Sequence, residues 1–297
     1  MSAAGPPQGA RPLGGAARSV VRGEHTSDRA AALAAPPREW RAPSVFGSPG
    51  RRMAFWLIVA AYLVWAIGDL NVNWDRVLRG FPRALDLFAR MFPPAVGNKW
   101  HILASGMAES VQMAIASSLA GIVLAIPLGL CAARNLAPRP IYLAARGVIV
   151  VGRTFHEILI AIFCVKLFGF GPVAGLLTLA FSSAIFLAKM LAEDIENMKP
   201  GPVEAVRATG ASFGQVVFYA VTPQVVVRTL GVFIYRLDAN LRHSTVLGIV
   251  GAGGIGATLS SAFARYDFDF ACAILLTIAA MVAFGEWFSD WARRKIR

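Results

Sequence analysis

The sequence predicts an all-α membrane protein that crosses the bilayer about six times. Of its 297 residues, 56% are hydrophobic and only 15% are charged, which is too apolar for an ordinary soluble domain. The apolar residues gather in stretches of about twenty, the length at which a helix spans the hydrocarbon core. Lysine and arginine lie mostly between these stretches, as they do in polytopic membrane proteins.

Residues 1–50 differ in composition from the rest of the chain. They are rich in Ala, Gly, Pro and Arg and show no apolar periodicity, so we expect a disordered tail. They contain no signal-peptide core. Eight arginines from Arg11 to Arg52 outnumber three acidic residues, which places this tail in the cytoplasm. We assign residues 51–297 to one transmembrane domain.

Six apolar stretches follow this tail. They cover residues 53–70, 105–131, 140–168, 173–191, 215–239 and 268–288. If both termini are inside, the cytoplasmic segments hold 17 Lys and Arg, counting Lys189 at the inner end of the fourth stretch, and the outer segments hold 7, which is the bias that membrane insertion favours. We therefore expect a multi-pass protein of the cytoplasmic membrane with both termini in the cytoplasm.

An amphipathic pattern separates the first two stretches. Between residues 74 and 92, aromatic and aliphatic residues recur at helical spacing with arginines between them. This pattern predicts a helix lying in the outer membrane interface. Its apolar face is either a lipid anchor or a surface that receives an extracytoplasmic binding protein.

A polar loop at residues 193–214 interrupts the apolar second half of the chain. Pro200 and its neighbours end the preceding helix. A short helix is expected to start at Val203, with Glu204 in its first turn, where a negative charge suits the helix dipole. Gly210 supplies its flexible end. The charge bias puts this loop on the cytoplasmic side.

This loop resembles the coupling segment of permease subunits from binding-protein-dependent ABC importers. The family signature is Glu-Ala-Ala, a Gly after three further residues and a Pro after twelve more. Glu204, Ala205, Gly210 and Pro223 match it, whereas Val206 and Thr222 depart from it. The resemblance implies a helix, carrying Glu204, Ala205, Val206, Ala208 and Gly210, that inserts into a groove of an ATPase subunit. An incidental Glu-Ala pair in a hairpin loop stays open on the motif alone.

A longer likeness runs from about Ser105 to the C-terminus. ENMKPGPVEAVRATGAS and YRLDANLRHSTVLGIVGAGGIGATL are similar to the phosphonate branch of these permeases. The resemblance implies the MetI-like permease fold, a homodimer, two ABC ATPase subunits and an extracytoplasmic substrate-binding protein. It implies import of phosphonate or a related phosphorus oxyanion such as phosphate or phosphite. ATP and Mg would bind the partner ATPase, so no cofactor is expected on this chain.

The third apolar stretch carries charges that lipid would not tolerate. Arg153 lies near its centre, where a charge costs about 2.5–3.5 kcal/mol on insertion scales, so it should face protein or a wet cavity. Arginine suits phosphoryl oxygens. We therefore predict an anion path lined by Arg153, His156, Glu157, Tyr235, Arg236, Asn240, Arg242 and His243. Alternatively, Glu157, one helical turn after Arg153, pairs with it only to lock two helices together.

A glycine cluster precedes the last stretch. Gly251, Gly253 and Gly256 form G-x-G-x-x-G, and Gly254 lies among them. A dinucleotide site would need a second strand with an acidic residue, but an apolar stretch of helix length follows instead. We expect these glycines to permit a tight turn over a cavity. In the resembled family, this loop helps to form the outer gate.

Other functions are disfavoured. The basic residues are dispersed, which argues against nucleic-acid binding, and no phosphate loop, metal-ligand spacing or hydrolase triad occurs. Cys131, Cys164 and Cys272 lie in apolar stretches and are expected to be free thiols. The chain is therefore not expected to be an enzyme. The alternatives to an ATP-driven permease are an ion-coupled secondary transporter of a small anion, which would show interrupted inverted repeats, and a non-transporting membrane scaffold.

Overall fold

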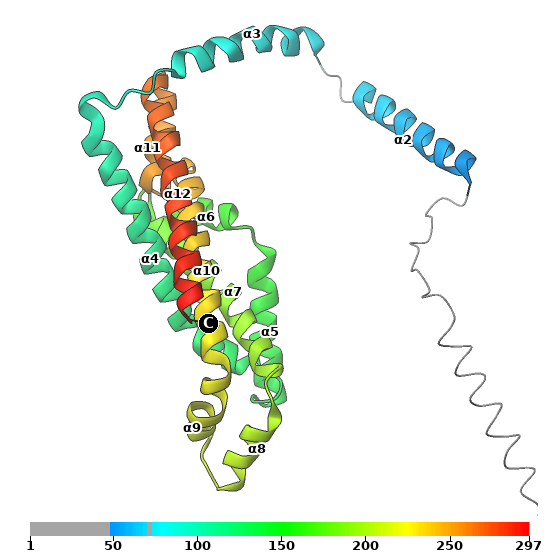
Figure 1. Cartoon of the computed structure of the whole chain (residues 1–297), viewed down its shortest axis with the longest axis vertical. Helices are drawn as coiled ribbons and strands as arrows, with labels where there is room; N and C mark the ends of the chain where they lie inside the picture. The colour runs from blue at the N-terminus through cyan, green and yellow to red at the C-terminus, as the bar shows by residue number, and fades with distance from the viewer. Residues whose placement is uncertain (1–47, 70–72, 297) are drawn as a thin grey trace, which may run out of the picture. The chain divides into compact units, whose positions relative to one another are not determined.

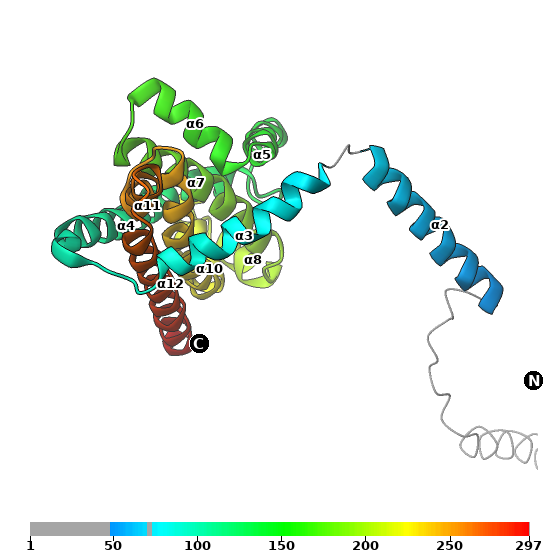
Figure 2. The same cartoon turned by 90° about the horizontal axis from the view of Figure 1, so that it is seen from above.

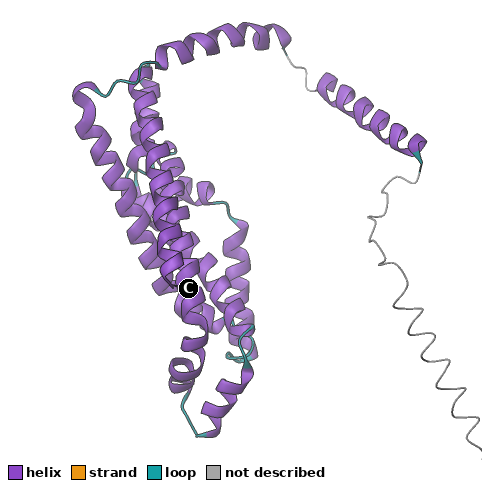
Figure 3. Cartoon of the chain, in the orientation of Figure 1, coloured by secondary structure: helices purple, strands orange, loops and turns teal. Residues whose placement is uncertain are grey.

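The computed structural model describes residues 48–69 and 73–296, and all regular structure in these ranges is helical (Figures 1 and 3). The elements are α2 (Pro49–Asp69), α3 (Trp74–Met91), a 3-10 turn (Gly97–Lys99), α4 (Trp100–Cys131), α5 (Arg139–Thr154), α6 (Glu157–Phe168), α7 (Pro172–Glu196), α8 (Pro200–Ala208), α9 (Phe213–Val216), a π-helical turn (Val217–Val221), α10 (Thr222–Ile249), α11 (Gly254–Ala264) and α12 (Phe268–Ile296). Five described stretches are long and apolar enough to span a membrane, or six if α5 and α6 form one bent span.

The N-terminal part forms a unit of its own. Its helix α2 starts four residues before the predicted stretch 53–70 and ends one residue earlier. Within α2 no residue is buried, as expected of a span whose side chains face lipid or other chains. The predicted disordered tail, residues 1–50, lies almost wholly outside the described residues.

Small side chains bring α4 and α7 into close contact. A Cβ added to Gly121 would lie 2.5 Å from the Cβ of Ser183, and one added to Gly129 would lie 3.1 Å from the carbonyl oxygen of Ala188. Close backbone approach through small residues is the usual way in which membrane helices associate. In Figure 2, α6 lies along one side of the group formed by α4, α7, α10 and α11.

The third predicted span is not a continuous helix. It divides into α5 and α6, which meet at an angle of 89°. Phe155 and His156 adopt extended conformations between them, and the His156 Nδ1 accepts a 3.3 Å hydrogen bond from the backbone N–H of Ile158. This side-chain bond caps α6. Arg153 and Glu157 are therefore not one turn apart on a single helix, contrary to the prediction.

The polar loop of residues 193–214 also differs in detail. The preceding helix α7 continues to Glu196, and α8 begins at Pro200 rather than at Val203. Prolines fit the first helical turn because it needs no backbone donor. Glu204 therefore lies in the second turn, and its predicted stabilisation by the helix N-terminus is wrong.

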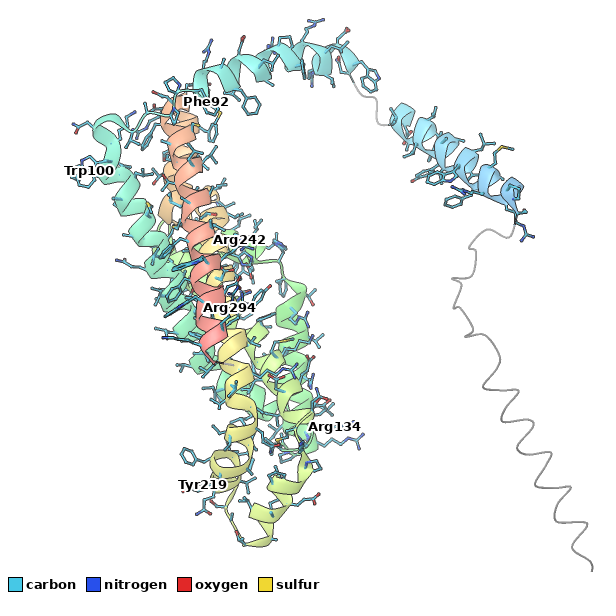
Figure 4. The ribbon with its side chains drawn as sticks, viewed as in Figure 1. Phe92, Trp100, Arg134, Tyr219, Arg242 and Arg294 are labelled. Atoms are coloured by element: carbon cyan, nitrogen blue, oxygen red, sulfur yellow. The ribbon has the colours of Figure 1, made fainter. Side chains whose placement is uncertain are left out.

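The ends of the bundle are distinct. In Figure 1, α8 and α9 lie at one end and α11 lies toward the other. Figure 4 shows Arg134 and Tyr219 toward the α8 end and Trp100 at the opposite end. At that opposite end Lys99 forms an ion pair with Asp267, and this hydrogen bond lowers the pKa of the Asp267 carboxyl. The pair therefore persists below the pH at which an ordinary aspartate is protonated.

Candidate functional site

A polar cavity of about 460 Å³ opens where α5 breaks from α6 against α7 and α10. It collects five of the eight residues predicted to line an anion path. The five are Arg153, His156, Glu157, Arg236 and His243. The cavity also has apolar walls, which include Phe155, Ile185 and Phe186. A few converging polar groups in an otherwise apolar hollow are typical of small-molecule sites.

Glu157 is the centre of this polar group. Its Oε1 accepts a 2.8 Å hydrogen bond from Arg236 Nη2 and a further one from Ser182 Oγ. Its Oε2 lies 2.5 Å from His243 Nδ1. The Arg236 side chain is only 6% exposed and that of Glu157 is 19% exposed. The Glu157 carboxylate therefore connects the start of α6 with two positions on α10, Arg236 and His243, which lie two helical turns apart.

Arg236 is held by α7 as well. Its Nε donates to Ser183 Oγ at 3.0 Å and its Nη2 donates to Ser182 Oγ at 2.7 Å. The guanidinium lies 5.4 Å from the ring centre of Phe186, within the range of a cation–π contact. Adjacent serines on an apolar span could have been noticed in the sequence, but only the fold shows that they face an arginine.

Asn240 lies one helical turn after Arg236 on α10 and does not line the cavity. It is fully buried, and its Nδ2 lies 2.8 Å from both Ser118 Oγ and Ser183 Oγ. Its Oδ1 has no hydrogen-bond partner in the described part of the chain. This amide therefore links α4, α7 and α10, a role that interhelical polar groups often have in membranes.

Two more predicted path residues lie elsewhere on α10. Arg242 forms ion pairs with Glu286 of α12 at 2.5 Å and with Asp238 at 3.4 Å. Tyr235 is half exposed and lines a neighbouring hollow of about 600 Å³. Phe186 lines both hollows. The structure therefore does not bring Arg242 or Tyr235 to the polar cavity.

Arg153 has a different environment from Arg236. It is exposed at the end of α5 and lines the polar cavity. Among the described residues, no carboxylate lies within ion-pair distance of Arg153, so its expected pairing with Glu157 is wrong in this conformation. Glu157 is turned instead toward α10, because the chain bends between the two residues. Arg153 thus contributes to the cavity a positive charge that no described carboxylate pairs with.

The short helix α8 presents an accessible surface at one end of the bundle. Glu204, Ala205 and Ala208 are exposed, whereas Val203 is 6% exposed and packs against the π-helical turn. The backbone N–H of Lys199 donates to Gln224 Oε1 of α10 at 3.1 Å. Gly210 follows the helix with a φ of 80°, a value that favours glycine. The hydrogen bond ties α8 to the first turn of α10, and the packing of Val203 ties α8 to the π-helical turn that leads into α10.

The glycine cluster forms a tight turn, as its pattern predicts. Gly251, Gly253 and Gly254 have positive φ angles, and a Cβ on Gly256 would collide with the carbonyl oxygen of Thr245. The start of α11 is already occupied, because the backbone N–H of Gly254 donates to Glu109 Oε2 at 3.0 Å. A phosphate group would need these same donors. The cluster therefore serves helix packing rather than a dinucleotide.

The sequence is similar to known transport proteins over most of its length. Residues 125–297 match the family model described as binding-protein-dependent transport system inner membrane component. Over 240 residues the chain is 40% identical to the phosphate-import permease protein PhnE of Mycolicibacterium smegmatis, covering 80% of this chain and 44% of that one. It is 35% identical over 234 residues to the phosphite transport system permease protein PtxC of Stutzerimonas stutzeri, covering 78% and 84% of the two chains.

A solved structure supports the same fold. A chain of the inward-facing MetNI methionine ABC transporter aligns with a TM-score of 0.60 at 21% identity, covering 68% of this chain and 99% of that one. An amino acid ABC transporter aligns with a TM-score of 0.55 at 19% identity, covering 66% and 95%. At these identities the likeness concerns the fold alone. The match over residues 125–297 and the relatives together show that this chain belongs to the inner membrane components of binding-protein-dependent transport systems, as a multi-pass permease subunit of an ABC importer.

Proposed function

We propose that this chain forms the membrane path by which an ATP-driven importer carries phosphonate or a related phosphorus oxyanion, phosphate or phosphite, by alternating access. The observation that supports this substrate class most strongly is the likeness to relatives named for phosphate and phosphite. The polar cavity supports it independently, because arginine and histidine donors suit phosphoryl oxygens. Membership of the importer family disfavours a secondary transporter or a scaffold.

Within the cavity, we assign first contact with the anion to Arg153 and His156. Arg153 has no carboxylate partner in the described part of the chain. The His156 Nδ1 accepts a backbone hydrogen bond, so a neutral imidazole carries its proton on Nε2 and can donate from there. Arg236 and His243 are already engaged by Glu157. Two available donors would hold the anion weakly enough for release.

Energy would enter at α8. We assign Glu204, Ala205, Val206, Ala208 and Gly210 to the surface that docks onto an ABC ATPase, which would bind the ATP and Mg. A displaced α8 would move α10 through Gln224 and through the packing of Val203. Since α10 carries Arg236 and His243, this route connects ATP hydrolysis with the polar cavity.

The assembly would contain two permease units, two ATPase subunits and an extracytoplasmic binding protein, in the cytoplasmic membrane with both termini inside. The family supports the ATPase and binding-protein partners. The 240 matched residues are only 44% of the Mycolicibacterium relative, whose chain therefore has room for a second segment of this size. A pair of such units, here two copies of this chain, would each present one α8 to one ATPase. The glycine turn at Gly251–Gly256 would form part of the outer gate.

The first prediction tests Arg153 as a pathway residue. Arg153→Gln should lower uptake of ³²P-phosphate or of methylphosphonate about tenfold or more, because one charge-assisted donor contributes about 1.5–3 kcal/mol. Expression and ATPase association should be retained. Arg139→Gln is the matched control, since Arg139 starts the same helix but does not line the cavity. Equal uptake by both variants would refute the assignment of Arg153.

A further inference from the structure

The transport function leaves the amphipathic helix α3 unexplained. Six large apolar side chains of α3 are more than half exposed, and at 100° per residue they share one side of the helix. These residues are Trp74, Val77, Leu78, Phe81, Leu85 and Phe88. Leu87, on the other side, and Met91, at the end, are less exposed. A continuous apolar face of this size must be covered in the working protein.

The opposite side of α3 is cationic. Arg79, Arg83 and Arg90 lie about 140–180° from Trp74 around the helix. Asp75 and Asp86 lie at the edge of this side, and Asp75 forms an exposed ion pair with Arg79 at 3.8 Å. The helix therefore combines an apolar face with a row of arginines, which is the composition of helices that lie in a lipid interface.

Chain length fixes where this helix can go. Only residues 70–73 separate α3 from the span α2, and only residues 92–96 separate it from the apolar stretch that begins at Gly97. Segments of four or five residues extend at most about 14–18 Å. At the C-terminal end of α3, Met91 is buried. Just beyond it, the backbone N–H of Ala95 donates a hydrogen bond to the carbonyl oxygen of Asp269 in the first turn of α12.

A helix held this closely to a span at each end cannot extend far from the membrane. Its 18 residues are about 27 Å long, and both linkers return to the same face of the bilayer, because one span ends where α3 begins and the next starts where it stops. An orientation along the membrane surface satisfies both linkers. It also covers the apolar face.

We propose that α3 lies in the membrane interface opposite the α8 side, with its apolar face among the acyl chains and its arginines bound to the phosphates of anionic lipid headgroups. Arginine binds phosphate oxygens through paired donors. The helix thickness of about 10 Å places these side chains at headgroup level when the opposite face reaches the acyl boundary. The occupant of the face is lipid rather than a binding protein.

Spin labels on the full chain in nanodiscs test the immersion. A Cys131→Ser background leaves Cys164 and Cys272, which are buried, and single cysteines are then placed at Leu78, Leu85 or Arg83. In phosphatidylcholine with about one-third phosphatidylglycerol, labels at positions 78 and 85 should collide with oxygen more than with a water-soluble nickel chelate. The label at position 83 should show the reverse. Nickel-dominated collisions at positions 78 and 85, or their protection only after a binding protein is added, would overturn the proposal.

The charge side needs a separate comparison. Arg83→Gln with Arg90→Gln should shift the equilibrium at the position-85 label toward its water-exposed state by about tenfold or more in anionic nanodiscs, since each arginine near an anionic surface contributes roughly fivefold. In pure phosphatidylcholine the same change should have little effect. Asp86→Asn is the opposite-sign control and should favour immersion. An equal response of the double variant in both lipids would show that the arginines do not bind anionic headgroups.

Discussion

Glu157 shows what residue spacing can and cannot tell. Its presence in a span, together with Arg153, Arg236 and His243, indicated a polar site, and the structure brings these four residues to one cavity. The spacing also suggested a pair with Arg153, and that was wrong because the helix breaks at Phe155. The actual partners lie on α10. The relative register of distant helices depends on tertiary packing, which no local pattern encodes.

The ion pair between Glu157 and Arg236 predicts a compensating double change. Arg236→Met alone leaves a carboxylate without its main partner, and we expect destabilisation of about 3 kcal/mol, the low end for buried pairs because Glu157 keeps some exposure. Arg236→Met with Glu157→Leu should recover most of it. Thermal unfolding of the purified protein measures both. If the double variant is no more stable than the single one, the pair does not hold α6 to α10.

Measuring uptake by the same variants distinguishes a structural role of the Glu157–Arg236 pair from a role in transport. A double variant that is stable but inactive would place the pair in the anion path as well. A variant that is stable and active would make the pair structural only, leaving Arg153 and His156 as the available donors.

The helices differ in how readily the sequence predicts them. Long apolar stretches gave both ends of α2, α4 and α7 to within five residues, because bilayer thickness sets the length of such stretches. The start of α12 was also predicted, but this helix continues eight residues beyond the predicted end. The α11 helix was not assigned as a separate element, since its glycines indicated a turn as much as a helix. The extension of α10 to Ile249 was missed as well. Its charged residues shorten the apolar signal, yet they are neutralised by partners on α6 and α12.

Close packing of α10 and α11 yields a prediction at Gly256. Gly256→Ala would place a methyl group against the carbonyl oxygen of Thr245, and overpacking of this kind costs about 1–3 kcal/mol or more. Gly147→Ala is the matched control, because a Cβ there meets nothing within 4 Å. The melting temperature should fall for the first variant and stay near wild type for the second. Equal melting temperatures would contradict the close approach of these helices.

The connection between α8 and α10 predicts a loss of coupling. Gly210→Val forces a β-branched residue into a positive-φ position and should disturb the end of α8, lowering ATPase co-purification and uptake while leaving the subunit in the membrane. Gly214→Val is the control, because Gly214 lies in the neighbouring helix α9 and a Cβ added there meets nothing within 4 Å. Normal ATPase binding by Gly210→Val would argue against α8 as the docking helix.

The complete bundle has two ends with different chemistry, and this asymmetry underlies the proposed mechanism. One end carries α8 and the arginine-containing α4–α5 connection, and the other carries the glycine turn and α11. Composition and hydropathy predicted this layout because a lipid bilayer imposes it. They could not predict the break at Phe155–His156, which depends on a side-chain cap and creates the cavity. The substrate class came from sequence likeness, and the cavity adds a physical reason for an anion.

The proposed transport of a phosphorus oxyanion is tested most directly in proteoliposomes. The chain is reconstituted with its ATPase and binding protein, and accumulation of phosphite, phosphate and methylphosphonate is measured with and without internal ATP-Mg. We predict concentrative uptake of at least one of the three that requires ATP and falls about tenfold in Arg153→Gln. Uptake driven by an ion gradient without ATP, or no uptake of any of the three by a complex that hydrolyses ATP, would contradict it.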